Sequence, residues 1–261
     1  MQQKIDVTDL WQRMQHEARE ISHHEPEMTS MLNDVVLSRS DLATALACRL
    51  SRKLAREDMC KQALMPLLSD IFSKNPTLVA SAARDLLAIC ERDPACDSPL
   101  IPLLYFKGFC AITTYRVSHV LWQAGRKHLA FYFQSLSSEI FAVDIHPAAR
   151  IGCGILLDHA TSLVIGETAI VEDNVSILHE VTLGGTGKAT GDRHPIIRSG
   201  VLIGAGAKIL GRVEVGTGAK IGAGSVVLHD VPAHKTVAGV PAVIVGEARQ
   251  SAPALDMDQQ L

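Results

Sequence analysis

An aliphatic side chain returns at every sixth position through the second half of the chain. The column runs through three phased blocks, which are Ile145, Ile151, Leu157; Ile165, Val171, Ile177, Leu183; and Ile203, Ile209, Val215, Ile221, Val227. A six-residue period kept over many units is typical of a parallel β-helix, whose short strands stack one column of side chains inward. A β-sandwich is the alternative, but its strands alternate at period two without a six-residue phase. The pattern therefore predicts a solenoid over residues 143–246.

The six-residue phase slips at two places, and both slips carry histidine and aspartate. Leu157 and Ile165 are eight residues apart, so we expect a bulge or a widened corner between them. Leu183 and Ile203 are twenty residues apart, which predicts that residues 184–195 leave the solenoid as a loop. Loops on a rigid repeat scaffold are where binding and catalytic sites are commonly built. The two slips are therefore the first candidates for the chemistry.

The chain before Val143 is expected to be helical, because apolar residues recur there at helical spacing between proline and capping residues. The expected helices are Asp6–His24, Met28–Ser38, Leu42–Arg56, Leu67–Lys74, Thr77–Glu91, Pro102–Ala124 and Arg126–Ala142. Proline at a first helical position, as at Pro76, and glycine after a last one, as at Gly125, support these bounds. The helices contain no cofactor motif, so their predicted roles are packing and assembly.

Composition limits the classes of function. The chain has 261 residues, of which 47% are hydrophobic and 20% charged, so it can bury a large core and hold two domains. A net charge of −3 gives no basic excess for nucleic acid, and no run of eighteen apolar residues predicts a membrane span. The first residues lack a secretory pattern, and the six cysteines form no Cys-x-x-Cys pair. Scattered thiols are typical of a reducing compartment, so we expect a cytoplasmic protein.

The loop that begins at Gly184 only partly resembles a phosphate-binding loop. A Walker motif would need glycine at position 182 and a hydroxyl residue at position 189, where the chain has Thr182 and Ala189. Backbone amides of a glycine-rich loop can still line a long ligand, and Lys188 is suited to contact a phosphate.

Three histidines of the solenoid raise the question of a metal site. His159, His179 and His194 lie twenty and fifteen residues apart, which differs from the closely spaced pair of the β-helical carbonic anhydrases, so we expect no metal. His159 is better suited to act as a general base, because Asp144 and Asp158 lie in adjacent sequence units and could fix its other ring nitrogen. The plainer alternative is a corner histidine that is hydrogen-bonded for structure alone.

Several segments closely resemble the bacterial serine O-acetyltransferase family. In the solenoid they are Asp144-Ile-His-Pro-Ala-Ala, Leu157-Asp-His-Ala-Thr, Val181-Thr-Leu-Gly-Gly-Thr-Gly-Lys, Gly191-Asp-Arg-His-Pro and Ala238-Gly-Val-Pro-Ala. In the helical part they are Arg92-Asp-Pro-Ala and Pro102-Leu-Leu-Tyr-Phe-Lys-Gly-Phe. The last solenoid motif alone marks only the broad hexapeptide acyltransferase superfamily, whereas the two motifs around His159 and His194 with this helical leader are specific. The likeness reaches to about Gly246.

This resemblance implies an α+β multidomain fold. An all-α N-terminal assembly domain over residues 1–142 would precede a left-handed parallel β-helix over residues 143–246, which is the catalytic domain, and homotrimers would pair into hexamers. The implied reaction transfers acetyl from acetyl-CoA, as a co-substrate, to the hydroxyl of L-serine in cysteine biosynthesis, with no permanently bound cofactor. Residues 247–261 have too little apolar surface to bury, so we expect a flexible tail.

The same resemblance implies roles for particular residues. Catalysis would fall to Asp144 and His159, the ammonium of L-serine to Asp93 and Asp158, and its carboxylate to Arg193 and His194. Acetyl-CoA would contact Gly184, Gly185, Thr186, Gly187, Lys188, Ala205 and Ala223. The division of the substrate fits the chemistry, because an amino acid needs an anionic partner at one end and a forked cationic donor at the other. Taken alone, Asp93 beside Pro94 is a turn former.

Two other functions are left open by the residues. Another hexapeptide acyltransferase would acetylate a sugar or a different amino-acid hydroxyl, although Arg193 argues against a sugar. The second open function is a catalytically silent assembly scaffold. The intact pair of Asp144 and His159 argues against it. L-cysteine is an expected feedback inhibitor, because it shares both amino-acid ends with L-serine. A complex with O-acetylserine sulfhydrylase is doubtful, since the family's longer tail ends in isoleucine and this one ends in Leu261.

Overall fold

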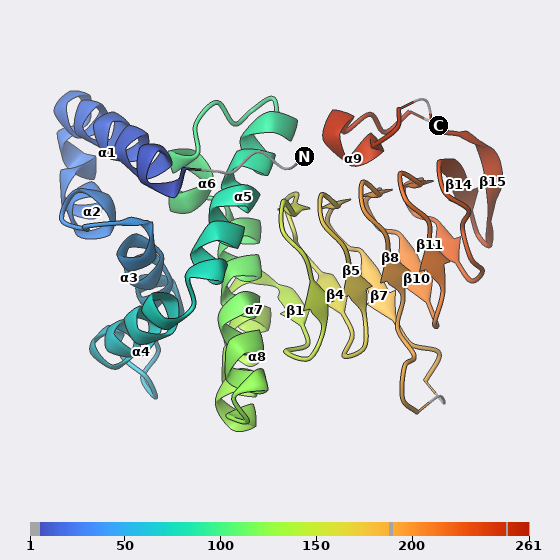
Figure 1. Cartoon of the computed structure of the whole chain (residues 1–261), viewed down its shortest axis with the longest axis horizontal. Coiled ribbons are helices and arrows are strands. Elements are labelled where there is room, and N and C mark those ends of the chain that lie inside the picture. The colour runs from blue at the N-terminus through green and yellow to red at the C-terminus, as the bar shows by residue number, and fades with distance from the viewer. Residues whose placement is uncertain (1–5, 188–189, 249, 261) are drawn as a thin grey trace.

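A helical part and a parallel β-helix stand side by side in the computed structural model, which describes residues 6–187, 190–248 and 250–260 (Figure 1). The helical part contains α1 (Val7–His24), η1 (Pro26–Met28), α2 (Thr29–Leu32), η2 (Asn33–Leu37), α3 (Leu42–Leu54), α4 (Lys61–Lys74), α5 (Pro76–Arg92), α6 (Leu100–Leu104), α7 (Lys107–Gln123) and α8 (Lys127–Phe141). None of the described helices is long and apolar enough to cross a membrane.

Three of the expected helices differ from the structure. The second is broken into a 3-10 turn, an α-helical turn and a π-helical turn. Helix α4 begins at Lys61, so Pro66 lies inside it, because the burial of Leu64 and Leu68 holds both sides of the proline in one helix. The long helix expected after Pro102 is interrupted at Tyr105, which separates α6 from α7.

The β-helix has three faces, each a stack of short strands from successive coils. The strands are β1 (Val143–Ile145), β2 (Arg150–Ile151), β3 (Leu156–Leu157), β4 (Leu163–Ile165), β5 (Ile170–Val171), β6 (Ser176–Ile177), β7 (Thr182–Gly184), β8 (Ile196–Ile197), β9 (Leu202–Ile203), β10 (Lys208–Leu210), β11 (Glu214–Val215), β12 (Lys220–Ile221), β13 (Val226–Val227), β14 (Lys235–Gly239) and β15 (Ala242–Glu247). The first sheet stacks β1, β4, β7, β10 and β13; the second stacks β2, β5, β8 and β11; and the third ends with β14 and β15. The pairing is parallel except between β14 and β15.

The six-residue column fills the interior, which confirms the predicted solenoid. In the first sheet, one aliphatic side chain lies above the next along Ile145, Ile165, Leu183, Ile209 and Val227, all at most 3% exposed. The long slip is the predicted loop, because β7 ends at Gly184 and β8 resumes the inner column with Ile197. A repeated aliphatic therefore fixes both the period and the register of the coils.

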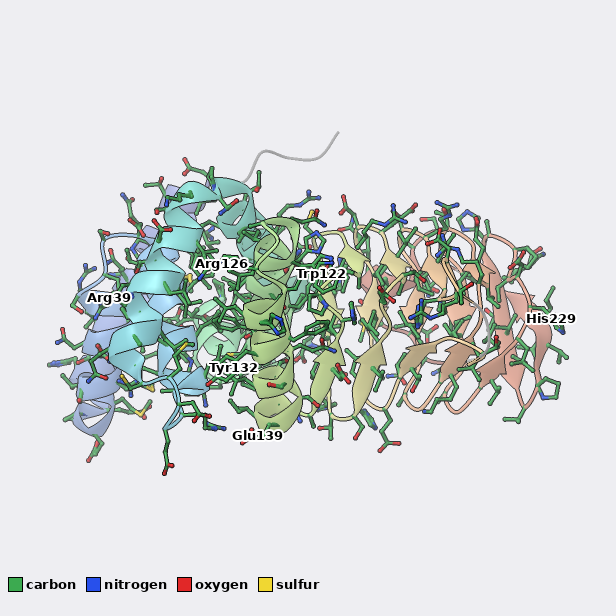
Figure 2. All side chains as sticks on the ribbon, turned by 90° about the horizontal axis from the view of Figure 1, so that it is seen from below. Arg39, Trp122, Arg126, Tyr132, Glu139 and His229 are labelled. Atoms are coloured by element: carbon green, nitrogen blue, oxygen red, sulfur yellow. The ribbon has the colours of Figure 1, made fainter. Side chains whose placement is uncertain are left out.

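Buried polar contacts join the two parts. The carboxylate of Asp85 on α5 accepts hydrogen bonds from Arg116 on α7, at 2.7 Å from Nη2, and from the backbone of Ile155 in the first coil. Arg116 also donates to the carbonyl of Gly152. Both charged side chains are almost fully buried, so removal of either one would leave an uncompensated charge in the core. Figure 2 shows Trp122, at the end of α7, on the side of the helices that faces the β-helix.

Residues 250–260 fold back on the β-helix, whereas the sequence predicts a flexible segment after residue 246. Helix α9 (Pro253–Asp256) packs beside α5 and β9, and Ala254 is fully buried. Its amide donates to the carbonyl of Gly200, and its carbonyl accepts from Ser176 Oγ at 2.8 Å. This segment of small residues thus reaches a backbone carbonyl and a serine hydroxyl of the β-helix. The composition of the segment does not reveal these partners.

Candidate active site

A cavity of about 560 Å³ lies where the helical part meets the first coil. Its lining comes from the turn after α5, the start of α7 and the end of β3, and consists of Asp93, Ala95, Tyr105, Phe106, Lys107, Gly108, Leu156, Leu157, Asp158 and His159. Asp93 therefore faces the same space as the consecutive residues Asp158 and His159, from a distant part of the sequence. The cavity combines two carboxylates with an imidazole, which suits a cationic group beside a transferable proton.

His159 occupies the widened corner predicted from the first phase slip. Its backbone has φ +53°, and the following Ala160, with φ +58°, turns its methyl group into the interior. The imidazole is 76% exposed, and its Nε2 lies 3.8 Å from the Asp158 carboxylate. The ring also meets that of His179 from the next coil, edge to face at 5.9 Å between centroids. The imidazole is therefore accessible to a substrate and has a carboxylate within range.

Asp93 ends helix α5 and is held in place by the residue before it. The guanidinium of Arg92 is buried against the second coil, where Nη1 donates to Ser176 Oγ at 3.1 Å. Burial lowers the pKa of Arg92 to about 10, so the side chain stays charged at neutral pH. The carboxylate of Asp93 accepts from the amide of Ala95 at 2.9 Å, as a turn former does. Asp93 is thus both a turn residue and part of the cavity wall.

Asp144 and His159 are not joined in the described structure. The carboxylate of Asp144 accepts a hydrogen bond of 2.6 Å from Gln134 Nε2 on α8. Both of these residues line a separate surface cavity of about 450 Å³. The expected catalytic dyad is therefore absent as a contact among the described residues, although both side chains belong to the first coil and its corner.

Arg193 and His194 lie at the opposite end of strand β4 from His159. Arg193 pairs with Glu167 at 2.6 Å, and His194 contacts Thr168, both in the segment that follows β4. The amide of Thr168 donates to His194 Nδ1, which leaves Nε2 as the protonated nitrogen. Burial, and next the positive charge of Arg193, lower the pKa of His194, so it is a neutral donor at pH 7. Within one chain, Arg193 and His194 do not line the cavity of His159.

The residues expected to contact acetyl-CoA fall into two groups. Ala205 and Ala223 occupy the same row of corners as His159, since the carbonyl of Ala205 accepts from Gly224 in the coil below and that of His179 accepts from Gly206. Residues 184–187 leave the β-helix at the other end of the first sheet, in the loop beside Arg193. Lys188 lies outside the described residues.

Three further residues, Lys107, Gly108 and Gln134, shape these sites and were not predicted, and a fourth, His179, was considered only as a metal ligand. Lys107 lines the cavity and donates to Thr161 Oγ1, in the same corner of the chain as His159. Gly108 touches β3 so closely that a Cβ would overlap the carbonyl oxygen of Leu157. Gln134 on α8 donates to Asp144 in the first coil, and the ring of His179 contacts that of His159 from the next coil. The motif from Pro102 to Phe109 was a usable signal for the first two, whereas nothing in the sequence pointed to Gln134.

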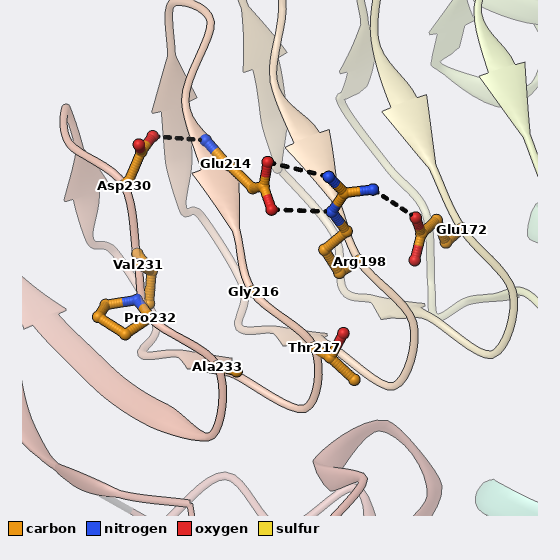
Figure 3. Close-up of a pocket in the computed structure, with 9 residues that line it drawn as sticks. All are labelled: Glu172, Arg198, Glu214, Gly216, Thr217, Asp230, Val231, Pro232 and Ala233. Carbon is orange, nitrogen blue, oxygen red and sulfur yellow. Dashed lines mark hydrogen bonds and ion pairs between the residues drawn. The ribbon is translucent and has the colours of Figure 1, made fainter.

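A third cavity, of about 580 Å³, lies on the second sheet, and charged residues form part of its lining (Figure 3). Arg198 is held between Glu172, at 2.7 Å, and Glu214, at 2.9 Å, while Asp230 accepts from the amide of Glu214. The hydrogen bond from Arg198 lowers the pKa of Glu214. These charges satisfy one another along successive coils, so the arrangement is a structural ladder. The described residues also contain no cluster of three side chains suited to hold a metal.

Comparison with known proteins agrees with this architecture. Residues 10–114 match the family model of the N-terminal part of serine acetyltransferase, and residues 194–229 match that of bacterial transferase hexapeptide repeats. A serine acetyltransferase of Salmonella typhimurium is 53% identical over 250 residues, which cover 96% of this chain and 92% of the relative.

Two solved structures of such enzymes superimpose closely on the chain. One, from Brucella abortus in complex with coenzyme A, is 51% identical with a TM-score of 0.90, covering 92% of this chain and 96% of that one. The other, a complex with cysteine, is 50% identical with a TM-score of 0.95, covering 98% of this chain and 99% of that one.

Proposed function

Because the chain belongs to the serine acetyltransferase family, we propose that it transfers acetyl from acetyl-CoA to the hydroxyl of L-serine, a step of cysteine biosynthesis. The observation that carries the proposal is the cavity shared by Asp93, Asp158 and His159. Two carboxylates are the partners that the ammonium of an amino acid needs, and an exposed imidazole beside them is suited to receive the hydroxyl proton.

His159 acts as the general base in the proposed reaction. Its imidazole takes the proton of the serine hydroxyl, and the oxygen attacks the thioester carbon of acetyl-CoA. The bond from carbon to sulfur then breaks, and the imidazolium returns the proton to the departing thiolate. General base assistance of this kind contributes roughly a hundred- to ten-thousand-fold in rate.

Asp144 is proposed to orient His159 in the substrate complex. In the described structure the Asp144 carboxylate is engaged by Gln134 at 2.6 Å instead. Catalytic hydrogen bonds are often long in a free enzyme and form fully with bound substrate. Asp158 supports the imidazolium from 3.8 Å and also faces the ammonium of L-serine. Asp144 therefore orients the imidazole, whereas Asp158 stabilises its protonated form and the ammonium of the substrate.

The carboxylate of L-serine is proposed to bind Arg193 and His194 of a neighbouring copy of the chain. Within one chain, Arg193 and His194 stand at one end of β4 and His159 at the other. Of these three residues, only His159 lines the cavity. Homotrimers, paired into hexamers through the helical part, would place the loop of one copy beside the corner of the next. Acetyl-CoA would then lie between the row of Ala205 and Ala223 on one copy and residues 184–187 of the other, with Lys188 near a phosphate.

Exposed apolar side chains at the end of the β-helix support assembly. Val240, Val243, Ile244 and Val245, on or beside β15, are each more than half exposed. Large apolar side chains exposed close together in sequence are suited to a contact between copies of the chain.

A complementation assay tests the shared site. We expect an oligomer of His159→Asn chains and an oligomer of Arg193→Leu chains each to have lost most activity with L-serine. Chains co-expressed and purified as mixed oligomers, through two different affinity tags, should regain activity, because some sites then combine two intact halves. Release of CoA from acetyl-CoA measures the rate, and homoserine and simple sugars serve as acceptor controls. No recovery in verified mixed oligomers would place both halves in one chain.

We also propose that L-cysteine inhibits by competing with L-serine for these groups, and that the enzyme acts in the cytoplasm. The similar structure solved with cysteine supports the first point, and the scattered unpaired cysteines support the second. Association with O-acetylserine sulfhydrylase is proposed to be weak, because the tail is engaged with Gly200 and Ser176.

A further inference from the structure

Two cysteines face each other across the turn that carries Asp93. Cys90 lies half-buried in the last turn of α5, and Cys96 is 2% exposed in the segment that follows. Their sulfur atoms are 3.6 Å apart, within hydrogen-bonding distance for thiols. A disulfide has a sulfur separation of about 2.05 Å, so roughly 1.5 Å of approach separates the two states. Rotation of the two side chains and a shift of the turn would have to supply that approach.

The turn between the two cysteines is already closed by its own hydrogen bonds. The amide of Cys96 donates to the carbonyl of Asp93 at 2.9 Å, and the amide of Ala95 donates to the Asp93 carboxylate. On the helix side, Arg92 is fixed to Ser176 of the β-helix. A covalent link between Cys90 and Cys96 would therefore deform the short segment between them, in which Arg92 is fixed by Ser176. Asp93 lies inside that segment.

We propose that Cys90 and Cys96 are an oxidation site that a hydroperoxide converts to an intrachain disulfide, and that this link moves Asp93 out of its position in the cavity. The hydroperoxide transfers one oxygen to the Cys90 thiolate, which becomes a sulfenic acid as the oxygen–oxygen bond breaks and an alcohol or water leaves. The Cys96 thiolate then attacks the Cys90 sulfur and displaces hydroxide. Two thiols and one hydroperoxide thus give the disulfide, one water and the reduced peroxide.

The surroundings set the rate of this oxidation. Burial raises the pKa of both thiols, so few thiolates exist at neutral pH. Because the thiolate is the nucleophile, oxidation is slow near pH 7 and accelerates as the pH rises. The half-exposed Cys90 is accessible to a small peroxide, and the nearby Cys96 captures the sulfenic acid before further oxidation. A dithiol reductant restores the starting state.

The expected effect on catalysis rests on the proposed binding of the L-serine ammonium by Asp93. Formation of the disulfide does not depend on that proposed function. A displacement near 1 Å of a substrate-positioning group can cost on the order of a hundredfold in rate. We expect oxidation to raise the KM for L-serine at least about tenfold, while the KM for acetyl-CoA changes less than about twofold, because Ala205 and Ala223 lie in other coils.

The first test is chemical. The full-length oligomer is treated with hydrogen peroxide at several pH values between 7 and 9, alkylated and digested without reductant. We expect a peptide in which Cys90 and Cys96 are linked, at a rate that rises with pH and with full reversal by dithiothreitol. The link must be absent in Cys90→Ala and in Cys96→Ala, and present in the control Cys60→Ala, which removes an exposed cysteine far from the turn in sequence. Free thiols at both positions, or sulfinic acid alone, would refute the site.

The second test is functional and uses the same samples. Wild type and Cys60→Ala should lose affinity for L-serine on oxidation and regain it on reduction, whereas Cys90→Ala should not respond. Unchanged KM for L-serine in a sample shown to be linked overturns the effect on Asp93. If instead no sample acetylates L-serine, the proposed function has failed, and the peptide map still decides whether the disulfide forms.

Discussion

Gly166 faces the imidazole of His194 so closely that a Cβ on the glycine would overlap the ring. Gly166→Ala should therefore displace His194 without removing it. We expect the KM for L-serine to rise tenfold to a hundredfold, on the order of one lost hydrogen bond to a charged group, with little change for acetyl-CoA. The matched control is Gly246→Ala, since no atom lies within 4 Å of that Cβ position. An unchanged KM for L-serine would show that His194 does not contact the substrate.

Gly108→Ala tests the contact between helix α7 and the cavity. Its Cβ would overlap the backbone oxygen of Leu157, which cannot rotate away, so the start of α7 must move. We expect a loss of about 1–3 kcal/mol in the free energy of unfolding, as for an overpacked core. Activity with L-serine should fall as well, because Lys107 and His159 line the same cavity. Urea unfolding followed by circular dichroism measures the free energy of unfolding. Wild-type stability in this variant would contradict the close contact between Gly108 and Leu157.

His159→Asn should abolish most acetyl transfer without disturbing the fold. Asparagine tolerates the positive φ of this corner better than alanine does, and the imidazole is mostly exposed. We expect kcat to fall about a hundred- to ten-thousand-fold with an unchanged melting temperature. Retention of more than about a tenth of the wild-type kcat would exclude His159 as the general base.

Asp34→Asn should destabilise the helical part in a pH-dependent way. A hydrogen bond from Lys61, and after it one from Arg52, lower the pKa of Asp34 to about 2. A lowered carboxyl pKa stabilises the fold above the unfolded value near 3.8, and the effect disappears as pH falls through 2. We expect a difference of about 2 kcal/mol at pH 7 that falls to roughly half by pH 3. Asp70→Asn, which removes an exposed pair with Lys74, is the control and should change little.

Ala254→Glu should release helix α9. The side chain of Ala254 is fully buried, so a longer charged one does not fit. We expect the slow hydrogen exchange of the Ala254 amide, which donates to Gly200 in the wild type, to become fast in the variant. Asp256→Ala, nearby on the exposed side of α9, should keep the protection. Fast exchange in the wild type itself would restore the flexible tail that the sequence predicts.

The sequence predicts the β-helix well, because one periodic signal determines the inner column, the pairing of Ile145 with Ile165 and the position of the long loop. It predicts the helices less well where tertiary contacts decide. Pro66 continues a helix because apolar residues on both sides are buried, and the break at Tyr105 coincides with the approach of Gly108 to Leu157.

The candidate site also contains residues that the sequence locates and residues that only tertiary packing brings together. The phase slip locates the corner of Asp158 and His159, since a local insertion is visible in a repeat. Asp93 joins them only through the docking of helices on the first coil, which no local pattern encodes. The bond from Gln134 to Asp144 crosses a boundary between helix and strand, and it depends on the left-handed turn at Ala142 that brings the two elements together.

The two ends of the β-helix are held unequally, and this gives its unfolding a direction. The first coil is clamped by the buried Asp85 and Arg116 pair, whereas the last is covered by the β14–β15 hairpin, whose Val243 and Ile244 face solvent in the single chain. In a solenoid each coil is stabilised mainly by its neighbours, so loss of structure begins at the weaker end and spreads. We therefore expect the coil that carries His159 to fray last under denaturant, so that its corner keeps its shape while distal coils open and close.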